Sequence, residues 1–270
     1  MDWEPAHADH SIDNVSVLFT FTEPVDADSF DEIVIPLRKA ATAHRFNNRV
    51  EGQEASEISL PATPGQPVMI NIGAVPMTRR VAFQQAADNV VSSEFSMGVA
   101  SFTMWTTRYR RWANFFSELS DLYTAIDGVW PLSKRVKSIR LQYVDRFLSA
   151  PGGASHLEVL AEQNPTFLTI PQADPTAAFH VHTGWFNYDA RPGCRLLTNV
   201  NIDAGDVRAQ LGRERRNMSF LTLMQFESLD ASLEDPLAQA DQLHQRLKLL
   251  FRQLISRPAA ARVGLSEHQP

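Results

Sequence analysis

Residues 101–147 read SFTMWTTRYRRWANFFSELSDLYTAIDGVWPLSKRVKSIRLQYVDRF and contain the most regular pattern in the chain. Their first residues, around Phe102 and Met104, predict a strand that leads into a helix. Apolar side chains then recur every three or four positions from residue 109 to residue 126, as on one stripe of an α-helix. Gly128 and Pro131 end that helix. Residues 138–147 alternate between apolar and polar side chains, which predicts a half-buried strand.

Asp145 breaks the alternation of this last strand. It falls on the face that carries Leu141, Tyr143 and Phe147. A carboxylate on a core face costs free energy unless it is hydrogen-bonded or paired. We therefore expect either a partner for Asp145 or the end of the strand at this point, and a functional role is the alternative.

The rest of the chain adds strands in sequence with only occasional helices. We expect strands at 15–22, 68–72, 79–85, 89–97, 167–170, 178–186, 195–202 and 218–226, helices at 26–44, 156–163 and 235–257, and a long loop at 51–67. Asp235 as N-cap and Pro236 at the first helical position mark the start of the last helix. This order predicts an α+β fold with a mainly antiparallel, curved sheet that helices cover on one side.

An internal break is expected at 150–155, where Pro151, Gly152 and Gly153 follow one another. It divides the chain into an N-terminal α+β half, 1–149, and a C-terminal α+β half, 156–257, within one compact unit. Residues 258–270 are expected to form a flexible tail. Each half offers strands and a covering helix, as diverged copies would, but no residue-level repeat establishes a duplication.

Composition limits the classes of function. The chain has 270 residues, a net charge of -6 and Cys194 as its single cysteine. A general nucleic-acid surface would need clustered cations, so none is expected. One cysteine allows no internal disulfide, which fits a reducing cytoplasm. Neither a signal peptide nor a membrane-spanning run is visible, so we expect a cytoplasmic protein.

A group of arginines lies at the expected start of the central helix. Arg108, Arg110 and Arg111 alternate with aromatic residues, among them Trp105 and Trp112. Positive charge in a first helical turn opposes the helix macrodipole, so acidic side chains or a bound anion should compensate it. One interpretation is a phosphate or carboxylate site. The other is that the arginine stems cover apolar surface and their heads stay in water.

His180 and His182 lie two residues apart in an expected strand, so their side chains share a face. Some metal sites use this geometry, but a metal needs further ligands, and the sequence identifies none. The alternative is an exposed or hydrogen-bonded strand face. The sequence also lacks a G-x-S-x-G elbow and a G-x-G-x-x-G loop after a strand. We therefore predict no metal, no cofactor and no catalytic residue.

Several segments together resemble the TIGR04255 family of sporadically distributed, uncharacterised prokaryotic proteins. The resemblance is carried by residues 101–126, by LQYVDRF at 141–147, by TNVNIDAGDV at 198–207 and by LHQRLKLLFRQLIS at 243–256. Within them the family pattern matches Tyr109, Trp112, Tyr143, His244 and Phe251. Asp145 stands where the family has an asparagine. The resemblance covers about the last two-thirds of the chain and implies a prokaryotic setting without an assigned activity.

Two functions from different classes follow from these observations. The first is a non-enzymatic recognition or assembly protein, because aromatic and arginine residues are what binding surfaces favour. Its partner would be another protein encoded nearby or a second copy, and the family's patchy distribution suggests a defence or toxin-related gene cluster.

The second function is a small-ligand-binding protein or enzyme with a pocket between the sheet and the helices. Trp105, Trp112, Tyr143 and Trp185 would line that pocket, and Arg111 or His182 would orient a polar group. The candidate binding residues for the two functions together are Trp105, Arg108, Arg110, Arg111, Trp112, Tyr143, Asp145, His180 and His182.

Overall fold

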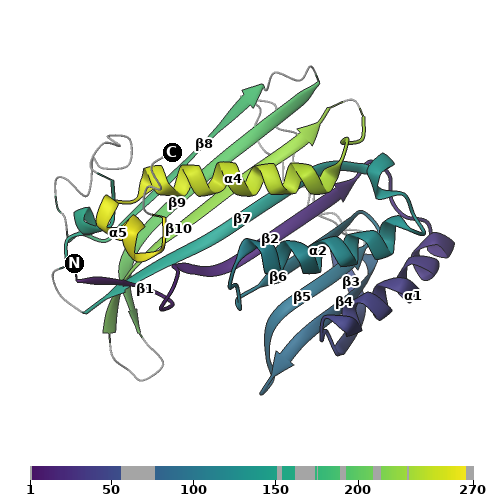
Figure 1. The fold of residues 1–270 in the computed structure, drawn as a ribbon, viewed down its shortest axis with the longest axis horizontal. Helices are drawn as coiled ribbons and strands as arrows, with labels where there is room; N and C mark the ends of the chain where they lie inside the picture. The colour runs from purple at the N-terminus through teal and green to yellow at the C-terminus, as the bar shows by residue number, and fades with distance from the viewer. Residues whose placement is uncertain are drawn as a thin grey trace.

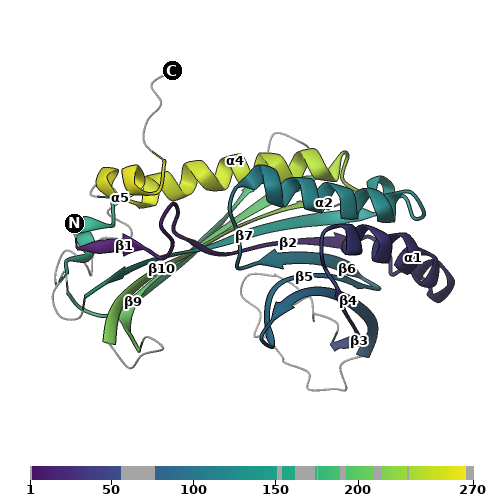
Figure 2. The ribbon, with the colours of Figure 1, turned by 60° about the horizontal axis from the view of Figure 1, so that its bottom comes forward.

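The computed structural model describes residues 2–55, 77–150, 154–161, 174, 176–188, 193–208, 214–229 and 231–265. These residues form the expected α+β fold, in which one antiparallel sheet of ten strands carries helices on one face (Figure 1). In Figure 2 strands β3 to β5 curl away from the helices, and the sheet stays open.

The strands are β1 (Trp3–Pro5), β2 (Ile12–Phe21), β3 (Asn48–Ala55), β4 (Met77–Ala87), β5 (Val90–Gly98), β6 (Ser101–Thr106), β7 (Val136–Ser149), β8 (Phe179–Tyr188), β9 (Cys194–Arg208) and β10 (Glu214–Ser228). The α-helices are α1 (Ala27–Ala43), α2 (Trp112–Asp127), α4 (Pro236–Leu254) and α5 (Arg257–Arg262). Two single 3₁₀ turns, η1 (Leu132–Lys134) and η2 (His156–Glu158), complete the described elements.

The strand order is β3-β4-β5-β6-β2-β7-β10-β9-β8, and β1 pairs with the end of β7. The two halves share part of their topology, but α1 and one meander strand of the first half have no counterpart among the described residues of the second. In each half a first strand, β2 or β7, leads to a meander whose last strand, β6 or β10, returns to pair with it antiparallel, and a long helix follows. The two first strands pair with each other at the centre of the sheet.

A continuous core joins the two halves. Its buried side chains come from β2, β6 and α2, and also from β9, β10 and α4, with Leu196, Phe226 and Leu243 among the latter. A second group of buried side chains, around Trp3, Phe147, Phe220 and Phe251, lies under the end of α4 and under α5. The expected break near residue 150 therefore separates segments that share both a sheet and a core.

Capping side chains set the starts of two helices. Asp26 caps α1 by accepting a hydrogen bond of 2.9 Å from the Ser29 N–H. Asp235 caps α4 in the same way, and Pro236 is the first helical residue, as predicted. Pro36 lies inside α1, and the helix continues through it as one element.

Four expectations about local structure are wrong in part. The loop expected at 51–67 begins with strand residues, since β3 runs to Ala55. Where the short helix was expected at 156–163, the described residues 156–161 form only the turn η2, and residues 162–163 lie outside the described residues. The tail expected from 258 onward begins as α5, whose Ala259 and Ala260 are buried against the second core. The central helix begins at Trp112 rather than at residue 109.

The strands expected at 68–72 and 167–170 lie outside the described residues. Among the helices of the described residues, none has both the length and the apolar character that crossing a membrane would require.

Candidate ligand-binding site

The segment that joins β6 to α2, residues 107–111, separates two cavities. Thr106 fixes its start, because the Thr106 hydroxyl shares a hydrogen bond of 2.7 Å with Ser93 and accepts one of 2.9 Å from the Arg108 N–H. Within the segment Tyr109 is buried, whereas Arg108 and Arg110 are exposed. Tyr109 therefore anchors the segment and leaves its arginines at the surface.

The sequence had predicted the arginines in the first helical turn, but they precede it. Arg111 is the N-cap of α2, with an extended backbone and no side-chain hydrogen bond to the first N–H groups. No acidic residue occupies the first turn of the helix. The positive electrostatic potential at the start of the helix therefore adds to that of the neighbouring guanidinium groups.

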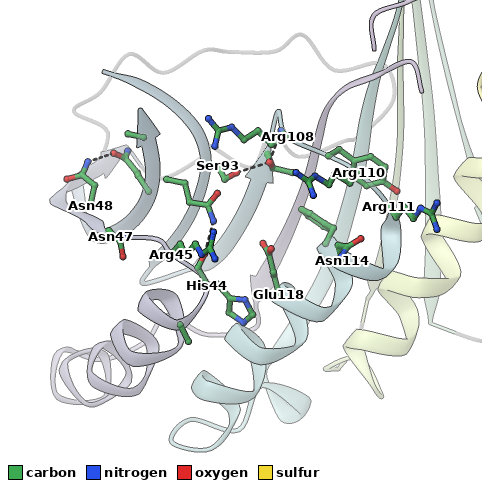
Figure 3. Close-up of a pocket in the computed structure, with 17 residues that line it drawn as sticks. His44, Arg45, Asn47, Asn48, Ser93, Arg108, Arg110, Arg111, Asn114 and Glu118 are labelled. Atoms are coloured by element: carbon green, nitrogen blue, oxygen red, sulfur yellow. Dashed lines mark hydrogen bonds between the residues drawn. The ribbon is translucent and has the colours of Figure 1, made fainter. Parts of the chain in front are cut away.

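The first cavity, which we call the arginine cavity, has a volume of about 760 Å³ and lies between the end of α1, strands β4 and β5, and the start of α2. It is lined by Arg45, Arg108, Arg110 and Arg111, and Glu118 is the one carboxylate among its described lining residues. Figure 3 shows Glu118 of α2 facing the space between Arg45 and Arg110, whereas the Arg111 side chain points away from it, toward α4. None of the four arginines forms an ion pair within the described part of the chain. Burial raises the pKa of Glu118, and the nearby His44 partly offsets this.

The second cavity, which we call the carboxyl cavity, has a volume of about 1260 Å³. It lies between strands β7 and β10 on one side and α2, α4 and the segment after α5 on the other. Asp145 of β7 lines it and is only 2% exposed. The Ser11 hydroxyl donates a hydrogen bond of 2.6 Å to Asp145 Oδ1. The expectation that Asp145 needs a partner is thus confirmed, and β7 continues past it to Ser149.

Burial dominates the electrostatics of Asp145. It raises the pKa of this carboxyl to about 7, and the hydrogen bond from Ser11 opposes the rise. Within the described residues no cationic side chain is paired with Asp145. At neutral pH the cavity therefore contains a buried carboxyl group that is close to half ionised.

A chain of aromatic contacts forms one wall of the carboxyl cavity. The Tyr143 hydroxyl and His244 Nδ1 share a hydrogen bond of 2.8 Å, and the Trp112 ring stacks on His244 with centroids 4.3 Å apart. Trp112 Nε1–H in turn donates a hydrogen bond of 2.6 Å to Asp241 Oδ1. Burial lowers the pKa of His244 to about 4, so its imidazole is neutral at physiological pH. These contacts join β7, α2 and α4 through a neutral histidine.

Thr222 completes the floor of the carboxyl cavity. It lies directly opposite Tyr143 in the pairing of β10 with β7 and is 1% exposed. Its hydroxyl has no hydrogen-bond partner among the described residues. A buried hydroxyl without a partner costs free energy, so this group is available to a ligand or a water molecule.

The two cavities share a wall. Tyr109, Arg110, Arg111 and Asn114 line both of them. Burial raises the pKa of Tyr109 to about 12, so this shared tyrosine carries no charge at neutral pH. A ligand that reaches past the segment 107–111 would therefore meet guanidinium groups on one side and the buried carboxyl on the other.

The structure brings together only some of the predicted site residues. Arg111, Trp112, Tyr143 and Asp145 line the carboxyl cavity, and Arg108 lines the arginine cavity. Trp105 does not join them, because Phe102 and Met104 of β6 point into the core and the alternation turns Trp105 to the uncovered face of the sheet. The pocket expected between Trp105, Trp112, Tyr143 and Trp185 is therefore not formed as one set.

The remaining candidates lie on the edge strand β8. Trp185 is 39% exposed, and His180 and His182 are exposed, pointing from the uncovered face. His180 contacts the Asp203 carboxylate of β9. The described residues contain no group of three histidine, cysteine, aspartate or glutamate side chains that could hold a metal ion.

Four residues of the carboxyl cavity and its aromatic wall were not predicted as site residues, namely Ser11, Thr222, Asp241 and His244, although His244 belongs to the family pattern. Asp241 and His244 are three positions apart in a helical pattern, which places them on one face of α4, and this was an available signal. Thr222 interrupts the face that carries Met218, Phe220 and Met224, which was a second local signal. Ser11 carries no such signal, because long-range strand pairing brings it to the site.

Comparisons with protein-family models, with curated proteins and with solved structures found no match for this chain.

Proposed function

We propose that this protein is a non-enzymatic binding protein whose ligand presents a phosphate or carboxylate group to the arginine cavity. The observation that carries the proposal is the set of four arginines around one cavity, none of them in an ion pair with a described residue. The first turn of α2 has no side-chain cap and no acidic residue, so it adds to the positive potential.

The charge distribution supports a specific site rather than a generally cationic surface. The whole chain carries a net charge of -6, yet the described residues that line this cavity include a single carboxylate, Glu118. Guanidinium groups hold oxyanions through paired N–H donors, and a planar fork gives direction as well as attraction. An anion with several oxygens would engage more than one arginine at once.

The lining of the arginine cavity supports binding over catalysis. Its buried hydroxyls, those of Ser93 and Thr106, hydrogen-bond to each other rather than to a histidine or a carboxylate. His44 is engaged with Asp121, at 2.9 Å between Nε2 and Oδ2. A nucleophile needs a base within hydrogen-bond reach, and these contacts provide none in this lining.

Calorimetric titration tests the proposal, with inorganic phosphate, pyrophosphate and citrate as probes. The wild-type protein is expected to bind at least one of them, most tightly at low ionic strength because the arginines are exposed. The double variant Arg108→Gln and Arg110→Gln should bind at least tenfold more weakly. A matched variant, Arg38→Gln with Arg257→Gln, removes two exposed arginines that do not line the cavity and should retain wild-type affinity. Equal losses in both double variants, or no binding by the wild type, would count against the proposal.

A second candidate function is recognition or assembly with another protein. The exposure of Arg108, Arg110 and Arg111 favours it, because arginine is enriched in protein interfaces. The resemblance to the TIGR04255 family would place such a protein in a prokaryotic cytoplasm, with a partner encoded nearby or a second copy of the chain. Light scattering tests self-association, and a complex with a neighbouring gene product that the double variant loses would favour this candidate over a small ligand.

A further inference from the structure

We infer that the carboxyl cavity is a second subsite, which binds the primary ammonium group of a ligand through Asp145. The inference deepens the proposed function. Its claim that the other end of the same ligand is anionic rests on that function, because this end would lie against the arginines. The ligand class is a zwitterion in which an aliphatic chain separates an ammonium group from a carboxylate or phosphate.

The first argument is the missing cation. Asp145 is 2% exposed, lines a cavity of about 1260 Å³ and accepts one hydrogen bond, from Ser11. No described cationic side chain pairs with it. A buried carboxylate without a cation is unfavourable, so a ligand ammonium that supplies the missing charge gains more there than in water.

The second argument is the number of hydrogen-bond acceptors around Asp145. An ammonium group has three N–H donors and no acceptor. The Asp145 carboxylate offers one acceptor, and the Thr222 hydroxyl, which has no partner among the described residues, offers another. Tyr109 also lines the cavity, and its hydroxyl is a third candidate. The polar floor therefore matches the donors of an ammonium group.

The third argument concerns the walls between the floor and the opening. Leu247, Phe251 and Val263 line the carboxyl cavity with apolar side chains. Arg110 and Arg111 are exposed and line both cavities. A hydrocarbon chain fits the apolar walls, and an anionic group at its far end would reach the arginines at the shared wall.

Among the described groups facing this floor, Asp145 is the one whose pKa burial raises to about 7. Burial lowers the pKa of His244 on α4 to about 4, burial lowers the pKa of His10, and burial raises the pKa values of Tyr109 and Tyr143. The remaining charged groups of the cavity are Asp9, Arg110, Arg111 and Lys248. Because the pKa of Asp145 is about 7, its ionised fraction rises roughly tenfold between pH 6 and pH 8.

Titration calorimetry with three probes tests the inference. The probes are hexylamine, which has only the amine, hexanoate, which has only the carboxylate, and 6-aminohexanoate, which has both. We expect hexylamine to bind the wild-type protein about tenfold more tightly at pH 8 than at pH 6. We expect 6-aminohexanoate to bind more tightly than either single-function probe.

Variants connect the binding to the named residues. Asp145→Asn should weaken hexylamine binding at pH 8 at least tenfold and abolish its pH dependence, whereas the matched variant Asp88→Asn, at an exposed aspartate that lines neither cavity, should change it less than twofold. Thr222→Val should weaken hexylamine binding severalfold. This variant provides a second test if Asp145→Asn does not fold. The wild-type pH profile needs no variant at all.

The outcomes separate this inference from the proposed function. Equal hexylamine affinity in Asp145→Asn and wild type, a flat profile from pH 6 to 8, or hexanoate binding as tight as that of 6-aminohexanoate would each overturn the ammonium subsite. If pyrophosphate fails to bind while hexylamine binds through Asp145, the subsite is supported and the proposed function is overturned. If Arg108→Gln with Arg110→Gln removes only the extra affinity of 6-aminohexanoate, both are supported.

Discussion

The two cavities on either side of residues 107–111 differ in the sign and the burial of their charged groups. In the arginine cavity the charges are exposed, so water solvates them and their presence costs the fold little. In the carboxyl cavity the single buried carboxyl has lost its water, and one hydroxyl is its only described side-chain partner. The contrast teaches that an unpaired charge at the surface changes the stability of the fold little. An unpaired charge in the interior carries a large free-energy cost, so it needs either a compensating interaction or a functional reason.

The largest expected effect is the pH dependence of stability due to Asp145. The pKa of Asp145 in the folded state, about 7, lies roughly three pH units above that of a free aspartate. The folded protein therefore holds a proton that the unfolded chain has released, and stability falls as pH rises from about 4 to 7. At about 1.4 kcal/mol per pH unit, Asp145→Asn should gain about 4 kcal/mol relative to wild type between pH 4 and pH 8.

Urea unfolding of both proteins at several pH values measures this difference. His244 and His156 have pKa values of about 4 in the folded protein, and they act in the opposite direction, since their lowered pKa values make stability rise with pH up to about 6.5. They are present in both proteins and cancel in the comparison. A difference that stays constant with pH would mean that Asp145 is not the buried titrating group described above.

The next effect concerns the link between α2 and α4 at the edge of the carboxyl cavity. Trp112→Phe removes the hydrogen bond to Asp241 and keeps an aromatic ring to stack on His244. A hydrogen bond to a charged group contributes about 1.5 to 3 kcal/mol, and partial exposure of this one places the expected loss at about 1 to 2 kcal/mol. A double-mutant cycle with Asp241→Ala isolates the pair, and a coupling energy near zero would show that the bond contributes nothing.

Residues 101–147 show which parts of this contrast local sequence can predict. Alternation along 138–147 was enough to predict a strand, to identify Asp145 as out of place and to demand a partner for it. It was not enough to name the partner, because Ser11 lies 134 residues away and reaches Asp145 only through the pairing of β2 with β7. The α+β class, the curved antiparallel sheet and the capped start of α4 follow from local patterns in the same way.

The errors near the site have a tertiary cause. The helical stripe was predicted to include Tyr109, but α2 begins at Trp112, since Tyr109 packs edge-to-face against Tyr143 at 6.0 Å between ring centroids. Trp105 was placed with Trp112 because both are aromatic and close in sequence. The inward direction of Phe102 and Met104 fixes the opposite direction for Trp105, so stricter use of the strand period would have excluded it from the cavity.

A smaller effect sharpens the contrast between satisfied and unsatisfied buried groups. Thr222→Val removes the buried hydroxyl that has no described partner, and we expect the protein to gain about 1 kcal/mol. Thr106→Val is the matched control, because the Thr106 hydroxyl is also buried but shares hydrogen bonds with Ser93 and with the Arg108 N–H. It should lose about 1 to 2 kcal/mol. Chemical denaturation of both variants gives the signs, and a loss of stability in both would mean that Thr222 has a partner in solution, such as a bound water molecule.

The smallest effect is expected from the arginines themselves. Arg108→Gln with Arg110→Gln removes two exposed charges that have no described ion pair and lie beside the positive end of α2. Relief of the repulsion from the helix dipole is worth a few tenths of a kcal/mol, so the free energy of unfolding should rise by less than about 0.5 kcal/mol in the absence of ligand. Urea unfolding at low and high salt measures it, and the gain should shrink as salt screens the dipole. A loss above about 1 kcal/mol would show that the arginines support the fold, whereas a neutral or slightly stabilising result leaves binding as the reason for placing uncompensated cations at this end of the helix.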